Sequence, residues 1–143
     1  MLKKAIAMAT KAHAGQVEKG GGVYIEHPLR VFALLPVEDD LTLITAVLHD
    51  VVEDTDITLE DIRREFSDEV ADAVDSVTRR RAETYFEFVA RAKKHPTGAK
   101  VKMADLKDHL RPGHEKYISE SLIKKYEKAI DFLGAPYHYG KKK

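Results

Sequence analysis

Cysteine is absent from this chain, and its absence excludes disulfide bonds and zinc sites with cysteine ligands. An excess of charge is also absent, because 24 lysine and arginine residues balance 24 aspartate and glutamate residues. Sequence-independent binding to nucleic acid requires a basic surface, so the neutral balance argues against it. A local basic pocket for a phosphorylated small molecule remains compatible with the composition.

Long apolar runs are missing as well. None approaches the roughly 20 residues that a membrane-spanning helix needs. Lysines and a histidine make the N-terminal segment too polar for a signal peptide. We therefore expect a cytoplasmic protein that binds neither nucleic acid nor membrane.

Alternating strand patterns are absent too, whereas apolar side chains recur at helical spacing along most of the chain. The 143 residues suffice for one domain with a hydrophobic core. We expect an all-α, single-domain bundle of about eight helices in residues 1–136, followed by a C-terminal tail at 137–143. The expected helices are 2–14, 28–36, 41–53, a short helix after Thr58, 67–77, 83–94, 100–110 and 119–133.

Local signals define several helix ends. Asp39 and Asp40 can cap the third helix, residues 58–61 resemble a capping box, and Ser67 opens the next helix. Residues 96–98, Pro-Thr-Gly, are expected to break the chain between two helices.

The most informative stretch is residues 49–54, His-Asp-Val-Val-Glu-Asp, at the end of an apolar run. A core helix has little reason to end in so many metal-binding or proton-transferring groups. Residues at i and i+4 share a helix face, so we expect His49 beside Glu53 and Asp50 beside Asp54. Such a cluster can hold a divalent cation and keep a carboxylate near a water molecule.

Two more ionisable residues stand where a helical core does not require them: His27, directly before a proline, and Asp105, inside the core-like segment 101–106. An all-α fold can bring them to His49 and Asp50, and this donor set suits Mn²⁺, Fe²⁺ or Zn²⁺. Alternatively, His27 is a capping residue, Asp105 is exposed, and His49 interacts with a helix dipole. Spacing alone does not decide between these interpretations.

The order of these segments resembles that of the HD-domain phosphohydrolases, in the branch of the RelA/SpoT hydrolase domains and the small alarmone hydrolases. The matching segments are 13–16, 24–31, 48–55, 77–80 and 101–105. The resemblance extends over residues 2–133 and implies the same all-α HD-domain bundle.

The resemblance also implies an activity, a cofactor and a set of site residues. The implied reaction of the stringent response is hydrolysis of the 3′-pyrophosphate of guanosine tetra- or pentaphosphate, (p)ppGpp, to GDP or GTP. Its ligands for Mn²⁺ would be His27, His49, Asp50 and Asp105. Its residues that position or activate the attacking water would be Glu53 and Asp54.

Contacts with the nucleotide substrate are harder to assign. The candidate residues are Lys11, Arg79, Arg80, Lys102, His109 and Tyr126. Each has a plainer interpretation, because charge runs are usually solvated, lysine stems snorkel along helices, and a tyrosine on an apolar stripe usually packs in the core. A second, nucleotide-synthesising domain would not fit in this length, so we expect degradation alone, by a monomer or a homo-oligomer.

Three positions depart from the family pattern. Glu18 stands where a basic residue is usual and would repel a phosphate. His109 stands where asparagine is usual, and Leu122 where arginine is frequent. These departures keep two alternatives open: another nucleotide or phosphorylated cofactor such as NADPH as substrate, or a non-catalytic nucleotide-binding module.

Overall fold

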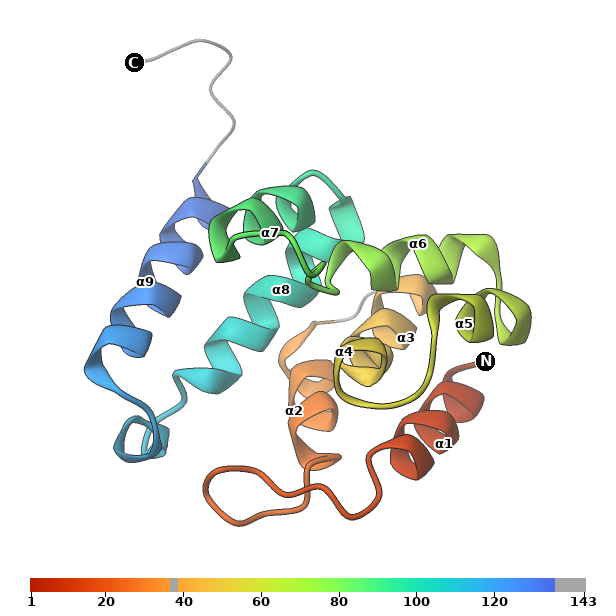
Figure 1. Ribbon diagram of the computed structural model, residues 1–143, viewed down its shortest axis with the longest axis horizontal. Helices are drawn as coiled ribbons and strands as arrows, with labels where there is room; N and C mark the ends of the chain where they lie inside the picture. The colour runs from red at the N-terminus through yellow and green to blue at the C-terminus, as the bar shows by residue number, and fades with distance from the viewer. Residues whose placement is uncertain (37–38, 136–143) are drawn as a thin grey trace, which may run out of the picture.

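The computed structural model describes residues 1–36 and 39–135, and the regular secondary structure of this part is helical apart from one isolated antiparallel bridge, Val17 to Val23 (Figure 1). Its elements are α1 (Leu2–Ala12), α2 (Glu26–Leu34), α3 (Asp40–Leu48), α4 (Val51–Asp54), α5 (Leu59–Glu65), α6 (Asp68–Ser76), α7 (Tyr85–Lys93), α8 (Pro96–His109), the 3₁₀-helix η1 (His114–Tyr117) and α9 (Glu120–Gly134). The expected all-α bundle is confirmed. The predicted tail, 137–143, lies outside the described residues.

Helices α3 and α8 form the centre of the bundle (Figure 1). Helix α3 contacts α1, α2, α6 and α8, while α8 also contacts α2, α7 and α9. The layer between α2, α3 and α8 is closed by a buried apolar cluster consisting of Val31, Ala46, Val77, Val101 and Ala104. This cluster packs together α2 and α8, which carry the buried side chains of His27 and Asp105, and α3, which ends beside His49. No helix in the described residues is both long and apolar enough to span a bilayer.

Several predicted caps are present. The side chain of Asp39 accepts from the backbone N–H of Thr42 at the start of α3. Thr58 and Asp61 form a reciprocal capping box at the start of α5. Ser67 caps α6. These contacts satisfy backbone donors that the first helical turn leaves free, and so they define where each helix begins.

The predicted continuous helix 41–53 is wrong, because the chain turns at His49 and Asp50 between α3 and α4. Nδ1 of His49 donates to the carbonyl oxygen of Ala46 at 2.7 Å. That carbonyl is the acceptor which the backbone N–H of Asp50 would use in a continuing α-helix. The helical turn resumes at once, since the backbone N–H of Asp54 donates to the carbonyl oxygen of Asp50 at 3.0 Å. Asp50 and Asp54 thus remain one turn apart, as expected.

The predicted break between two helices is present, but it lies at residues 94 and 95, because residues 96–98 form the first turn of α8. His95 is the N-cap, its ring nitrogen accepts from the backbone N–H of Gly98, and Pro96 occupies a first-turn position that proline tolerates. Gly98 is required for packing: a Cβ atom there would lie 2.2 Å from Oγ of Ser76. The Pro-Thr-Gly sequence therefore starts a helix and lets it approach α6.

Candidate metal centre

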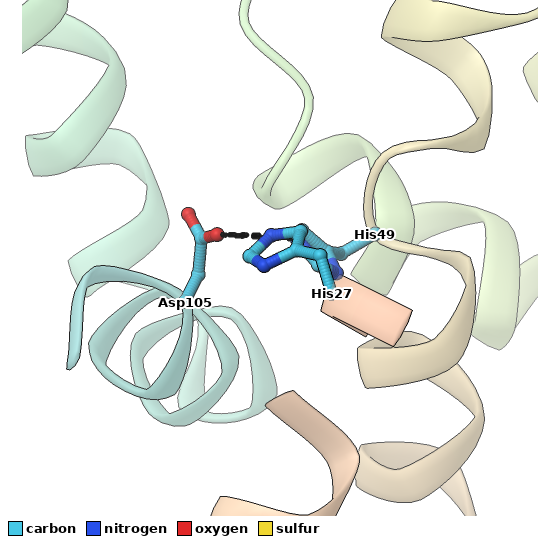
Figure 2. Close-up of side chains that lie close together, drawn as sticks. All are labelled: His27, His49 and Asp105. Atoms are coloured by element: carbon cyan, nitrogen blue, oxygen red, sulfur yellow. Dashed lines mark hydrogen bonds and ion pairs between the residues drawn. The ribbon is translucent and has the colours of Figure 1, made fainter. Parts of the chain in front are cut away.

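Three buried side chains from separate segments meet between α2, α3 and α8 (Figure 2). His27 lies in the first turn of α2, His49 directly follows α3, and Asp105 lies within α8. Nε2 of His27 is 2.9 Å from Oδ1 of Asp105 and 3.2 Å from Nε2 of His49. Nε2 of His49 is 3.3 Å from the same Asp105 oxygen. Three ligand-type atoms therefore converge within reach of a single ion.

Asp50 brings a fourth ligand-type atom to this cluster. Its Oδ2 lies 3.1 Å from Nε2 of His49 and 3.4 Å from Nε2 of His27. The residues expected to share a metal ion, His27, His49, Asp50 and Asp105, are thus brought together. Two imidazole nitrogens and two carboxylate oxygens form a mixed donor set that first-row divalent metals accept.

Both histidine rings are oriented by hydrogen bonds on the side away from the cluster. Nδ1 of His49 faces the carbonyl oxygen of Ala46, and because a carbonyl only accepts, this nitrogen carries a proton. Nδ1 of His27 lies 2.6 Å from Oδ2 of Asp108, which favours the same arrangement. In the neutral rings both lone pairs are then on Nε2, the nitrogen that faces the cluster, as metal ligation requires.

The electrostatics of the cluster favour positive charge at its centre. Burial lowers the pKa of His27, but nearby carboxylates, Asp105 foremost, outweigh burial and raise this pKa to about 12. Burial likewise lowers the pKa of His49, and Asp50 and Asp105 raise it to about 10. A divalent cation between the carboxylates would supply the charge that protons on the imidazoles otherwise provide.

Glu53 and Asp54, the expected water-handling pair, lie in α4 beyond Asp50. Oε1 of Glu53 accepts a hydrogen bond from the backbone N–H of Arg79. Partial burial raises the pKa of Glu53 in spite of this hydrogen bond. Partial burial and the charge of Asp50 also raise the pKa of Asp54. A carboxylate with a raised pKa accepts a proton more readily, which is what a general base needs.

His49, Asp50 and Asp105 of the cluster line a cavity of about 220 Å³ together with Glu53 and Asp54. Its lining combines acidic, basic and aromatic side chains: Tyr24, His49, Asp50, Glu53, Asp54, Val77, Arg79, Tyr85, Phe88, Lys102, Asp105, His109 and Tyr126. The cavity therefore presents three of the four ligand-type side chains, the carboxylate pair and two cations to one bound molecule.

Two of the candidate phosphate-binding cations, Arg79 and Lys102, line this cavity. The ammonium of Lys102 donates to Oδ2 of Asp105 at 2.9 Å, while Oδ1 of that carboxylate faces the histidines. The guanidinium of Arg79 donates to the backbone carbonyl of Glu83 and has no acidic partner in the described part of the chain. Among the residues described, Arg79 is thus a cation at the cavity whose guanidinium forms no ion pair.

Lys11 and Arg80 do not line the cavity. Lys11 lies along a separate open groove with Met8 and Asp56. Arg80 pairs with Asp75 at 2.9 Å on an exposed surface. The geometry therefore lends these two candidates no support, and the plainer interpretation of solvated charge accounts for both.

His109 and Tyr126 both line the cavity, and their rings stack with centroids 5.2 Å apart and an interplanar angle of 26°. The ring of His109 also lies 4.8 Å from that of His27, and its Nε2 is 3.2 Å from Oδ1 of Asp105. Tyr126 is therefore part of the cavity wall as well as of the apolar stripe of α9.

The expected repulsion between Glu18 and a phosphate is offset by arginines. Glu18 forms a bidentate ion pair with Arg30. Nη2 of Arg111 lies 3.7 Å from Oε1 of Glu18. Leu122 lies on α9 and is not among the residues that line the cavity.

Two side chains that line the cavity, Tyr24 and Tyr85, and one beside them, Lys125, were not singled out by sequence. The hydroxyl of Tyr24 donates to Oδ2 of Asp50 at 2.6 Å. The hydroxyl of Tyr85 is buried without a hydrogen-bond partner in the described residues. Nζ of Lys125 lies 4.1 Å from the Tyr85 ring centroid. Tyr24 precedes His27 by one helical turn, which was the available signal, whereas only the packing of α7 against α9 brings Tyr85 and Lys125 together.

A comparison with protein families now assigns the chain. The HD domain family profile matches residues 5–110. This range contains the metal-type cluster, which consists of His27, His49, Asp50 and Asp105, together with Glu53 and Asp54. The chain belongs to the HD domain family. This assignment confirms the family resemblance indicated by the sequence motifs, and the buried histidine and aspartate cluster of this HD domain fits a divalent metal ion.

Curated relatives of this HD domain are much longer proteins. A GTP pyrophosphokinase of Streptomyces coelicolor is 38% identical over 121 residues, which cover 77% of this chain and 14% of the relative. A guanosine-3′,5′-bis(diphosphate) 3′-pyrophosphohydrolase of Aquifex aeolicus is 35% identical over 121 residues, covering 77% of this chain and 17% of the relative. The chain thus spans less than a fifth of the length of these two proteins.

Solved structures of similar length share the fold. One, described as a metazoan ortholog of SpoT that hydrolyzes ppGpp and plays a role in starvation responses, aligns with a TM-score of 0.78 at 26% identity. The alignment covers 92% of this chain and 84% of that one. A protein of Listeria monocytogenes EGD-e aligns with a TM-score of 0.63 at 29% identity, covering 77% and 79% of the two chains.

Proposed function

We propose that this HD domain is a divalent-metal-dependent phosphohydrolase that removes the 3′-pyrophosphate of guanosine tetra- or pentaphosphate. The observation that carries the proposal is the convergence of the four ligand-type atoms of His27, His49, Asp50 and Asp105 at the wall of the cavity that Glu53 also lines. The name of the Aquifex relative and the description of the metazoan neighbour support the choice of substrate.

His27, His49, Asp50 and Asp105 would hold the ion. Mn²⁺ is our proposal for the native metal, and the same donors suit Fe²⁺ or Zn²⁺. When bound, the ion would neutralise charge on a phosphoryl oxygen and make a water molecule more acidic.

The remaining roles fall to side chains around the cluster. Glu53 accepts the proton of the attacking water, since partial burial raises the pKa of Glu53 and the N–H of Arg79 holds one of its oxygens. Asp54 orients that water from the next position of α4. Arg79 and Lys102 offset the negative charge of the transferred group, which is most of what phosphoryl transfer requires of a protein.

The reaction balances without a further co-reactant. The water oxygen bonds to the phosphorus that carries ribose O3′, and the bond between that phosphorus and O3′ breaks. Glu53 takes one water proton, O3′ leaves as a hydroxyl after protonation from solvent, and pyrophosphate is the second product. The nucleotide keeps its 5′-phosphates, so the other product is GDP or GTP.

The direct test incubates the purified chain with Mn²⁺ and guanosine tetraphosphate and measures pyrophosphate and orthophosphate separately. We expect GDP and pyrophosphate in equal amounts, and no turnover after chelation of the metal. Guanosine tetraphosphate that survives prolonged incubation with Mn²⁺ would contradict the proposal.

One observation favours a second substrate class within the same chemistry. His109 stands where the family pattern has asparagine and stacks on Tyr126 at the cavity wall, so the surface that meets the nucleotide differs. A panel of nucleotides and phosphorylated cofactors, NADPH included, tests this alternative by the product released. Binding of nucleotide to the metal-replete protein without any turnover would instead indicate a non-catalytic module.

A further inference from the structure

Behind the candidate metal ligand His27 lies a chain of charged side chains. Nδ1 of His27 meets Oδ2 of Asp108 at 2.6 Å. Oδ1 of Asp108 accepts from Nε of Arg30 at 2.8 Å, and the guanidinium of Arg30 also binds both carboxylate oxygens of Glu18. Arg111 flanks the chain, with its Nη1 3.2 Å from Oδ2 of Asp108.

This row of side chains is buried at His27 and Asp108 and more exposed toward Arg30 and Glu18. The side chains of His27 and Asp108 are 2% and 3% exposed, and that of Glu18 is 11% exposed. An imidazole N–H buried this deeply needs a protein acceptor, so Asp108 is the group that sets the orientation of the ring.

The same residues also form a second grouping of metal-type side chains, Glu18, His27 and Asp108. The hydrogen bonds of Arg30 to both carboxylates show that a guanidinium already supplies the positive charge there. This grouping is therefore an arginine-centred support for His27, with no need of a second cation.

Glu18 gives the support a connection to the loop between α1 and α2. The loop carries the isolated Val17 to Val23 bridge, and Glu18 joins that bridge through the hydrogen bond from its backbone N–H to the carbonyl oxygen of Gly22 at 2.7 Å. Its side chain reaches Arg30 on α2. The ion pairs of Arg30 with Glu18 and with Asp108 thus connect the loop to the Nδ1 side of the candidate metal ligand His27.

We infer that Asp108, held by Arg30 and Glu18, is a positioning residue that fixes His27 with its Nε2 lone pair toward the metal and thereby sets metal affinity. The inference rests on the proposed metal centre but not on the identity of the substrate. It also gives Glu18 a role that a basic residue at that position could not fill, since a cation there would repel Arg30.

The test measures Mn²⁺ affinity by calorimetry on metal-free protein for the wild type, Asp108→Asn and Arg30→Lys. The asparagine side chain still offers a carbonyl oxygen to Nδ1 of His27 but carries no charge, and the lysine side chain cannot bridge two carboxylates as a guanidinium does. We expect the dissociation constant of Asp108→Asn to rise roughly 10–100-fold, the range typical of partners behind a metal ligand. Arg30→Lys should give a smaller rise.

Asp131→Asn is the matched control, because it removes an exposed carboxylate on α9, outside this network. Thermal unfolding of each metal-free variant reports folding separately. A second readout is the ¹⁵N-histidine spectrum of the Zn²⁺-loaded protein. We expect a slowly exchanging Nδ1 proton on His27 in the wild type and its faster exchange in Asp108→Ala.

Folded Asp108→Asn protein whose Mn²⁺ affinity matches that of the Asp131→Asn control would overturn the inference. So would a Zn²⁺-loaded wild type in which His27 binds the metal through Nδ1. Protein that binds no divalent cation would overturn the inference together with the metal centre. Protein that binds Mn²⁺ but leaves guanosine tetraphosphate intact would overturn the proposed substrate alone.

Discussion

Tyr24 and Asp50 are joined by a 2.6 Å hydrogen bond in which the phenol donates to Oδ2, the carboxylate oxygen that faces both histidines of the cluster. The same hydroxyl lies 3.3 Å from Oδ2 of Asp54. One phenol thus connects a candidate metal ligand with a candidate water-orienting residue. Burial and the charge of Asp50 raise the pKa of Tyr24, so it stays a donor throughout the neutral range.

Tyr24→Phe removes this donor and little volume. A hydrogen bond to a charged group contributes on the order of 1.5–3 kcal/mol, so we expect Mn²⁺ affinity to fall about tenfold. Calorimetric titration of metal-free protein measures the change. Tyr117→Phe, at a residue outside the cavity, is the matched control and should leave the affinity unaltered. Equal affinities for the two variants would show that Tyr24 does not support Asp50.

Glu53→Gln should keep the metal and lower turnover by about 10²–10⁴, the factor expected of a general base. The base acts when deprotonated, and partial burial raises the pKa of Glu53. The acid limb of the rate profile should therefore lie at higher pH than an ordinary glutamate would give, and it should disappear in Glu53→Gln. Rates at saturating substrate from pH 5 to 9, with metal content measured in parallel, provide the check. Metal loss in this variant would reassign Glu53 as a ligand.

The segment before α7 is held by Arg91, which binds the carboxylate of Glu83 and the backbone carbonyls of Asp75 and Thr78. The hydrogen bonds from Arg91 lower the pKa of Glu83 to about 2. A lowered pKa stabilises the folded state above the unfolded value of about 4.5, and this contribution is lost as the pH falls toward 2.

The expected result is a stability difference between wild type and Glu83→Gln that is full above pH 5 and shrinks toward pH 2. Urea unfolding across this range measures it, and Glu69→Gln, an exposed residue of α6, serves as control. A difference that does not change with pH would show that the ion pair does not form.

Gly98→Ala should destabilise the protein by about 1–3 kcal/mol, the usual cost of overpacking. The new Cβ would lie 2.2 Å from Oγ and 3.0 Å from Cβ of Ser76, and 3.1 Å from the carbonyl oxygen of Ala92. Adding Ser76→Gly removes the first two contacts and should recover part of the loss, so the two changes should be non-additive in a double-mutant cycle. Simple additivity would argue against this close approach of α6 and α8.

Local features of the fold were readable from sequence because their causes are local. Asp39 and Ser67 bond to backbone groups three residues away, so the start of each helix is encoded beside it. The helix break at His49 was not readable. At this break, Nδ1 of His49 donates to the carbonyl oxygen of Ala46. The sequence does not indicate which acceptor a histidine ring will bond to.

The metal-type cluster could be predicted because its chemistry is unusual for a helical core, and the family motif supplied the positions that spacing could not. The surrounding cations could not be ranked in the same way. Lys11, Arg79, Arg80 and Lys102 look alike in a sequence. Only the packing of the helices turns Arg79 and Lys102 into the cavity while Arg80 pairs with Asp75.

The metal centre is tested most directly by crystals grown with Mn²⁺ and measured on both sides of the manganese absorption edge. We predict an anomalous peak bounded by Nε2 of His27, Nε2 of His49, a carboxylate oxygen of Asp50 and one of Asp105. We also predict that Asp50→Ala loses this anomalous peak and no longer releases pyrophosphate. An anomalous map with no peak at this cluster, from protein that hydrolyses guanosine tetraphosphate in the same buffer, would contradict the account.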